Sequence, residues 1–182
     1  RQAMEPLDAL VRAAMSYGVS DAKADEAMRA IGKEFGDLNE LRVATDLEIQ
    51  ELLGARYPDI ERRVAMITQS LNNIFEREHT LSLERLKTIS KRDVRGFLRE
   101  LPDIHPFVEA YVMVRAFEGS AFPIDAETLE YLIEEEIVID EKATLADAQK
   151  FVEHHVKAED LYGFFLATRA TVFEDSRRKK KK

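Results

Sequence analysis

The sequence has 182 residues, 45% hydrophobic and 34% charged, a profile typical of a folded helical protein and not of a disordered or fibrous chain. The length is enough for one domain, or two small ones, with a buried core. No Cys is present, which excludes disulfides, thiolate metal sites and thiol catalysis, and no apolar run reaches the roughly 18 residues of a membrane span. The net charge is −8, and without residues 177–182 it is −14, from 21 bases and 35 acids. Because residues 1–176 are so acidic, they repel polyanions on average. Any nucleic-acid contact must therefore come from a local basic patch or from residues 177–182.

Four helices are predicted in the first part of the chain, from apolar residues at helical spacing. Pro6 suits a first helical turn, and residues 17–21 interrupt the helical pattern. Thr45 and Glu48 predict a capping box. Pro58 is expected to open the longest helix of the chain, whose apolar stripe extends to Phe75. The predicted helices cover 6–15, 24–35, 45–53 and 58–75.

The second part of the chain adds a single turn at 82–86 and five more helices. One runs from Ser90 to Leu101, and the next starts at Pro106 and is so apolar that we expect it to be buried on most sides. Asp125 and Thr144 are favoured N-cap residues for two further helices, and the last covers 161–172. We therefore predict an all-α fold of nine or ten helices.

Residues 177–182 form a basic tail, which is expected to be a solvated, disordered end unless it supplies the nucleic-acid contact. The first residues show no basic region followed by an apolar one, so no secretory signal is predicted. We expect a cytoplasmic protein, associated with the nucleoid if it is bacterial.

Special residues gather between Leu98 and Tyr131. A short turn at 101–106 joins two helices with unlike faces, as in a helix-hairpin-helix. Asp125 stands alone among apolar neighbours, which would desolvate its carboxylate and suit it to act as a base. The same residue could serve only as a helix cap. Both roles stay open, because a cap can also be catalytic.

Four segments in this order resemble the helix-hairpin-helix DNA glycosylases of the endonuclease III superfamily, also called HhH-GPD. The turn starting Leu101-Pro102 resembles that family's Leu-Pro-Gly-Val-Gly hairpin, and residues 116–119 resemble its Ala-Phe-Gly segment. Ile124-Asp125 resembles the Val-Asp of the catalytic aspartate, and residues 15–21 resemble Leu-Ser-x-Gln-x-Thr-Asp. The resemblance covers about residues 7–173.

The resemblance implies a six-helix-type domain over 1–118, which includes the hairpin, and a C-terminal helical lobe over 119–176 without an iron–sulfur cluster. It implies Asp125 as the catalytic residue and Phe107 as a residue of the base pocket. It also implies duplex DNA as a partner, with the base rotated out of the helix. The residues that would contact DNA are Tyr17, Gly18, Leu101, Pro102, Asp103, Ile104 and His105.

The sequence departs from the family where DNA chemistry takes place. Asp103 and His105 replace the two hairpin glycines, so a negative charge and side chains stand where the backbone should approach a phosphate. Pro106 has no N–H to offer an anion. Phe107 occupies the position of the lysine that forms a Schiff base, so a lyase step is not expected. Gly18 stands where the family has the glutamine that fills the gap left by the flipped base.

Three interpretations follow. The first is a monofunctional DNA glycosylase that uses Asp125; the second is a non-catalytic DNA- or protein-binding module; the third has no connection to DNA. We expect His105 to be a surface turn residue, with phosphate contact as the alternative, and Tyr17 to pack at a core or rim unless it stacks on a base. A monomer without metal or cofactor is expected, and a protein partner and a preceding N-terminal segment are left open.

Overall fold

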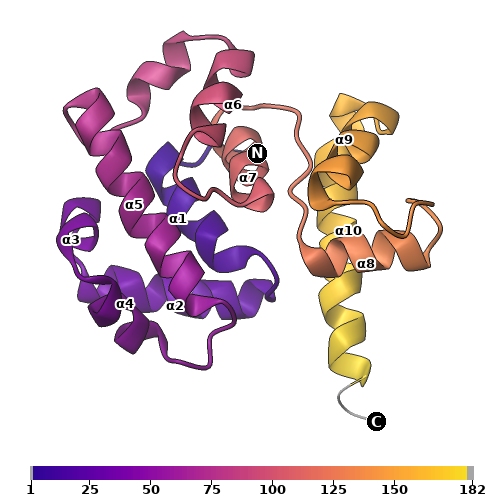
Figure 1. Cartoon of the computed structure of the whole chain (residues 1–182), viewed down its shortest axis with the longest axis horizontal. Coiled ribbons are helices and arrows are strands. Elements are labelled where there is room, and N and C mark those ends of the chain that lie inside the picture. The colour runs from indigo at the N-terminus through magenta and orange to yellow at the C-terminus, as the bar shows by residue number, and fades with distance from the viewer. Residues whose placement is uncertain (1, 180–182) are drawn as a thin grey trace.

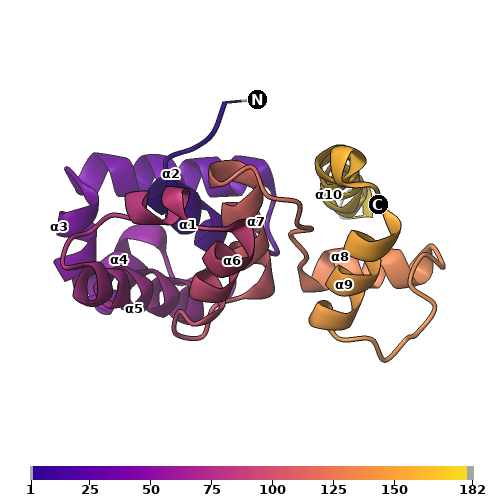
Figure 2. The same ribbon diagram turned by 90° about the horizontal axis from the view of Figure 1, so that it is seen from above.

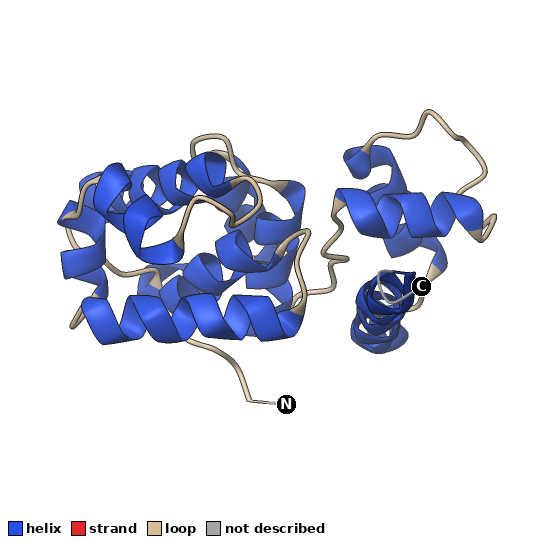
Figure 3. Ribbon diagram, turned by 90° about the horizontal axis from the view of Figure 1, so that it is seen from below, coloured by secondary structure: helices blue, strands red, loops and turns tan. Residues whose placement is uncertain are grey.

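The computed structural model describes residues 2–179, with side chains through Phe173. The prediction of an all-α fold is confirmed, because the described residues form ten α-helices and one 3₁₀-helix and no strand (Figure 3). The helices are α1 (Pro6–Ser16), α2 (Asp21–Glu34), α3 (Leu38–Val43), α4 (Asp46–Leu53), α5 (Ile60–Glu78), α6 (Lys91–Arg99), α7 (Pro106–Ala116), α8 (Ala126–Glu134), α9 (Leu145–His155) and α10 (Ala158–Lys179), with η1 (Glu84–Thr88) as the 3₁₀-helix.

The helices form two groups joined by the segment 117–125 (Figures 1 and 2). We call α1–α7 the first lobe and α8–α10 the second lobe. The predicted division into a domain over 1–118 and a C-terminal lobe over 119–176 stays a prediction. The side chains of the predicted basic tail, 177–182, lie outside the described residues. Among the helices that the structure describes, none is both long and apolar enough to cross a membrane.

Helix α7 lies on the side of the first lobe that faces the second lobe (Figures 1 and 2). It packs against α1 and α6, and nine of its eleven residues are buried. This confirms the expectation from its apolar sequence. Because α1 also buries most of its length, the α1–α7 pair forms much of the core of this lobe. Phe107 and Tyr111 lie one turn apart on α7, and the packing of this helix holds both side chains toward the second lobe.

Most helix starts follow the predicted caps. Pro6 occupies the first turn of α1, and Thr45 and Glu48 form the predicted capping box. Thr144 caps α9. The expectation that Pro58 opens the longest helix is wrong, because α5 begins at Ile60 and α10, with 22 residues, is longer. The residue between, Asp59, has a left-handed backbone (φ +55°) that turns the chain before the helix starts.

Candidate functional site: the hairpin and the junction between the lobes

The turn between α6 and α7 keeps the hydrophobic frame that the sequence predicts. Leu101 is buried, Pro102 and Ile104 are half-buried, and the Ile104 N–H donates to the Leu101 carbonyl. Asp103 at the tip is exposed and left-handed, with φ +48°. Asp tolerates this conformation better than most residues other than glycine, so Asp103 can form the tip of the turn. The Arg62 Nε lies 3.1 Å from the Asp103 carboxylate and balances its charge.

His105 is buried, with 6% of its surface exposed, so the expectation of a surface turn residue is wrong. It caps α7. Its Nδ1 accepts the Phe107 N–H at 3.0 Å, and its carbonyl accepts the N–H groups of Val108 (2.9 Å) and Glu109 (3.3 Å). Because Pro106 has no N–H, the first turn of α7 has no free backbone donor for a phosphate.

The ring of His105 is covered by Tyr17, which explains its burial. The two rings stack with centroids 4.2 Å apart, and the Tyr17 hydroxyl donates to Asp59 at 2.7 Å. Arg63 lies over the other side of the Tyr17 ring at 3.8 Å. Burial, and then the positive charge of Arg62, lower the pKa of His105 to about 4. Tyr17 therefore packs in the core, and a role in stacking on a base stays a hypothesis.

Asp125 joins the two lobes. Its Oδ1 accepts the Thr128 N–H at 3.0 Å, which makes it the predicted N-cap of α8. Its Oδ2 accepts the Gly18 N–H at 2.8 Å, from the turn between α1 and α2 in the first lobe. The Arg169 Nη1 lies 3.7 Å from the same Oδ2. The side chain is 1% exposed, so the carboxylate is both buried and fully partnered.

Gly18 is constrained at this junction. Its φ of +69° is in the left-handed region, and a Cβ there would lie 3.3 Å from a carboxylate oxygen of Glu127. Burial raises the pKa of Glu127, and the charge of Asp125 adds to this effect. The positive φ, together with the short distance to Glu127 of α8, favours glycine in the α1–α2 turn.

Arg63 of α5 holds the α1–α2 turn from within the first lobe. It is 1% exposed, and its guanidinium donates to the carbonyls of Ala14 (3.0 Å), Tyr17 (2.6 Å) and Pro58 (2.7 Å). Burial lowers its pKa, and the nearby Tyr17 opposes this. These carbonyls lie at the end of a helix or in a loop, so they have no helical partner and depend on the arginine.

Arg169 of α10 holds the same turn from the second lobe. Its Nη2 donates to the carbonyls of Ser16 (2.9 Å) and Val19 (2.8 Å), and its Nε pairs with Asp21 at 2.9 Å. The same guanidinium faces Asp125. No sequence motif predicts a role for Arg63 or Arg169, although Arg169 lies four residues after Phe165 and so faces the same side of α10.

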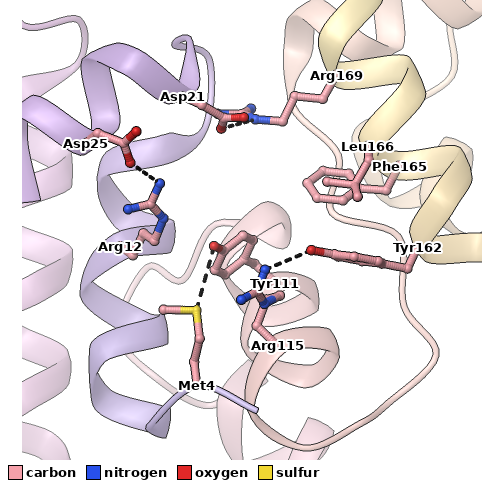
Figure 4. A pocket seen from close by; sticks show the side chains of 10 residues that line it. All are labelled: Met4, Arg12, Asp21, Asp25, Tyr111, Arg115, Tyr162, Phe165, Leu166 and Arg169. Carbon is pink, nitrogen blue, oxygen red and sulfur yellow. Dashed lines mark hydrogen bonds and ion pairs between the residues drawn. The ribbon is translucent and has the colours of Figure 1, made fainter. Parts of the chain in front are cut away.

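A cavity of about 440 Å³ lies between the lobes, next to Arg169 (Figure 4). Side chains of the N-terminal segment, α1, α2 and α7 form one wall, and side chains of α10 form the other. Arg12 pairs with Asp25, and the Arg115 Nη1 donates to the Tyr162 hydroxyl at 2.8 Å. The lining residues are Met4, Arg12, Asp21, Asp25, Tyr111, Arg115, Tyr162, Phe165, Leu166 and Arg169.

Phe107 lies directly behind this cavity. It is 1% exposed, and its ring packs against Tyr111 (5.8 Å) and Phe165 (6.0 Å), which both line the cavity. The Arg169 guanidinium lies 5.5 Å from its centroid. Phe107 thus supports the cavity wall; its predicted place in a base pocket stays a hypothesis.

The second lobe does not fit the iron–sulfur cluster of endonuclease III-like glycosylases, because the sequence contains no Cys. Within the part of the chain that the structure describes, no group of three or more His, Asp or Glu residues is placed to hold a metal ion.

Comparison with solved structures identifies the fold. A trapped endonuclease III–DNA covalent intermediate superposes with a TM-score of 0.72 over 93% of this chain and 74% of its own, at 12% identity. The chain has the helix-hairpin-helix DNA glycosylase fold. The same fold is found in an 8-oxoguanine glycosylase/lyase of Clostridium acetobutylicum bound to double-stranded DNA (TM-score 0.70, 16% identity), of which this chain covers 61%, while 98% of this chain is matched.

A 3-methyladenine DNA glycosylase of H. pylori bound to 1,N6-ethenoadenine also has the helix-hairpin-helix glycosylase fold, with a TM-score of 0.67 over 93% of this chain and 85% of its own, at 13% identity. No protein-family model and no curated protein matches the sequence. The likeness therefore establishes the fold, and the activity has to be argued from the site.

Proposed function

We propose that this protein is a monofunctional DNA glycosylase, which releases a base from duplex DNA by hydrolysing its N-glycosidic bond with the help of Asp125. The observation that carries the proposal is the cavity between the lobes, because Arg169 lines it and also lies 3.7 Å from the Asp125 carboxylate. A base in this cavity would bring its sugar toward the junction.

The cavity suits a base that has been rotated out of a duplex. Its volume of about 440 Å³ lies in the ordinary range of small-molecule sites. Tyr111, Tyr162 and Phe165 supply aromatic surface, and aromatic side chains commonly stack on flipped bases. Two of the three glycosylase structures described above were solved with DNA, which supports duplex DNA as the partner of this fold.

The chemistry would divide between a carboxylate and water. As the bond between C1′ and the base nitrogen breaks, positive charge develops on the sugar, and the negative charge of Asp125 would stabilise it. Water then adds to C1′ and passes a proton to the carboxylate, which loses it to solvent, while the departing base anion takes up one proton from solvent. Phe107 has no amine to attack C1′, so no Schiff base forms and the strand stays uncut at this step.

One observation favours a second candidate, a non-catalytic DNA-binding module. Both oxygens of Asp125 accept backbone N–H groups, and the side chain is 1% exposed. For catalysis, the Gly18 N–H or Arg169 would have to give way to substrate. In the binding module, the carboxylate would only cap α8 and tie the lobes together.

Base release separates the two candidates. We would incubate the protein with duplexes that carry a panel of damaged or mispaired bases and measure free base. The glycosylase releases at least one base, Asp125→Asn abolishes release, and borohydride traps no covalent adduct. Asp37→Asn is the matched control, since Asp37 is an exposed N-cap that accepts the Glu40 N–H at 2.9 Å.

If no base is released from the panel while duplexes still bind, the second candidate is correct. Deleting residues 177–182 then tests whether binding depends on the basic tail. A borohydride adduct would contradict the argument from Phe107.

A further inference from the structure

One guanidinium of the interlobe cavity has no balancing carboxylate. Arg12 pairs with Asp25, and Arg169 pairs with Asp21 at 2.9 Å. Arg115, by contrast, makes no ion pair among the described residues, and the partner of its Nη1 is the neutral Tyr162 hydroxyl at 2.8 Å. The cavity therefore carries one positive charge that its own walls do not neutralise.

Arg115 also has an unused donor. Its Nε is buried and makes no hydrogen bond within the described residues. A buried donor without a partner destabilises the folded state, so a ligand that accepts a hydrogen bond from this guanidinium would gain more than one that meets a satisfied group. Arg115 lines the cavity, so a ligand bound there would lie next to this guanidinium.

We propose that the cavity selects bases whose edges carry carbonyl oxygens and that are neutral or negatively charged, and that Arg115 is the residue that sets this preference. The inference rests on the proposed glycosylase function, because it assigns the substrate class of the same cavity. Oxidised and deaminated bases belong to the favoured class. Purines that carry a positive charge after N-alkylation belong to the disfavoured class.

The preference follows from the hydrogen-bonding and charge of the guanidinium. Arginine donates five N–H groups and accepts none, so it pairs with carbonyl oxygens and leaves exocyclic amino groups of a base unpaired. Hydrogen bonds from a charged donor are about twice as strong as neutral ones. A cationic base in the same cavity would instead meet a like charge, in surroundings where screening by water is reduced.

The two carboxylates of the cavity do not reverse this argument. Asp21 and Asp25 are 68% and 45% exposed, so they lie at the solvent side of the cavity. Each is paired with an arginine, Asp21 with Arg169 and Asp25 with Arg12. A cation at this edge would find their charge already balanced and screened by water.

Binding of two nucleosides to the intact protein tests the preference without any chemical step. At slightly acidic pH, xanthosine has two ring carbonyls and a negative charge, whereas 7-methylguanosine, which has nearly the same size, keeps its N1 proton and carries a positive charge. Titration calorimetry at low salt should show xanthosine binding at least about tenfold more tightly. Equal affinities, tighter binding of 7-methylguanosine, or no binding of either nucleoside at millimolar concentration would overturn the inference.

Two variants assign the preference to Arg115. Arg115→Met keeps much of the apolar stem but removes the charge and the donors, and should reduce the preference to less than about threefold. Arg56→Met removes an exposed arginine that does not line the cavity, and should keep the preference. Thermal unfolding of both variants checks that they fold. A preference that persists in Arg115→Met would contradict the assignment.

The failure of this inference and the failure of the proposed function can be told apart. If the nucleoside preference holds but no lesion is excised, the cavity keeps its selectivity and the glycosylase proposal fails. If alkylated bases are excised and carbonyl-rich ones are not, the glycosylase proposal stands and this inference fails.

Discussion

The hairpin and the junction each hold a carboxylate, in opposite surroundings. At the hairpin, Asp103 has a left-handed backbone (φ +48°) and an exposed carboxylate, and the first N–H groups of α7 are used internally. At the junction, the carboxylate of Asp125 is buried and accepts N–H groups from both lobes. The exposed carboxylate opposes contact with a phosphate and the buried one ties the lobes together, so the two regions should respond differently to substitution.

We expect the two regions to differ most in their contribution to the free energy of unfolding. Substitutions of two adjacent arginines, one in each region, test this difference. Arg63→Met would leave three carbonyls without their donor in the interior, and we expect it to lower the free energy of unfolding by about 3–5 kcal/mol. Arg62→Met removes only the exposed pair with Asp103 and should cost less than about 1 kcal/mol. Urea unfolding measures both. Similar losses would contradict the distinction between a buried junction and an exposed hairpin.

His105, on the buried side of the hairpin, should make the free energy of unfolding depend on pH. The pKa of His105 is about 4 in the folded protein and 6.5 in the unfolded chain, so the folded state binds fewer protons between these values. Stability therefore falls as pH drops from 6.5 to 4, by up to about 3 kcal/mol from this residue.

His105→Asn isolates that effect, because Asn can still cap α7 but does not titrate. Unfolding of the two proteins between pH 7 and pH 4 should show a flatter pH dependence in the variant. If both proteins lose stability in parallel, His105 is not the cause.

The smallest effect concerns duplex affinity at the hairpin. Asp103→Gly removes a negative charge and a Cβ at a left-handed position, and it frees Arg62 for a phosphate. We expect on the order of tenfold tighter duplex binding at low salt, and a salt dependence steeper by about one phosphate contact. Fluorescence anisotropy at several salt concentrations measures both quantities.

Asp103→Asn is the matched comparison, since it removes the charge but keeps a side chain. If charge alone matters, both variants bind alike; if backbone approach matters, the glycine variant binds more tightly. Unchanged affinity in both would mean that the hairpin does not contact the duplex.

Much of the local structure follows from the sequence. Helical spacing predicted an all-α fold and the burial of α7, and side-chain chemistry predicted the caps at Thr45, Asp125 and Thr144. These features depend on residues within one or two turns of each other, where periodicity and capping rules apply directly.

The partners of the junction could not be predicted in the same way. Asp125 meets Gly18 across 107 positions, and Arg169 meets Ser16 across 153. Helical periodicity tells which face a residue occupies but not which distant turn it contacts. His105 was expected on the surface for the same reason, because its stacking partner, Tyr17, lies far away in the sequence.

The rate of base release by Asp125→Asn tests the central claim most directly. With the best substrate of the panel in single-turnover conditions, we predict that this variant is slower than the wild type by at least about 100-fold, while Asp37→Asn keeps the wild-type rate. Equal rates in the wild type and Asp125→Asn would contradict a catalytic role for this carboxylate. So would a wild-type protein that binds duplexes but releases no base from any of them.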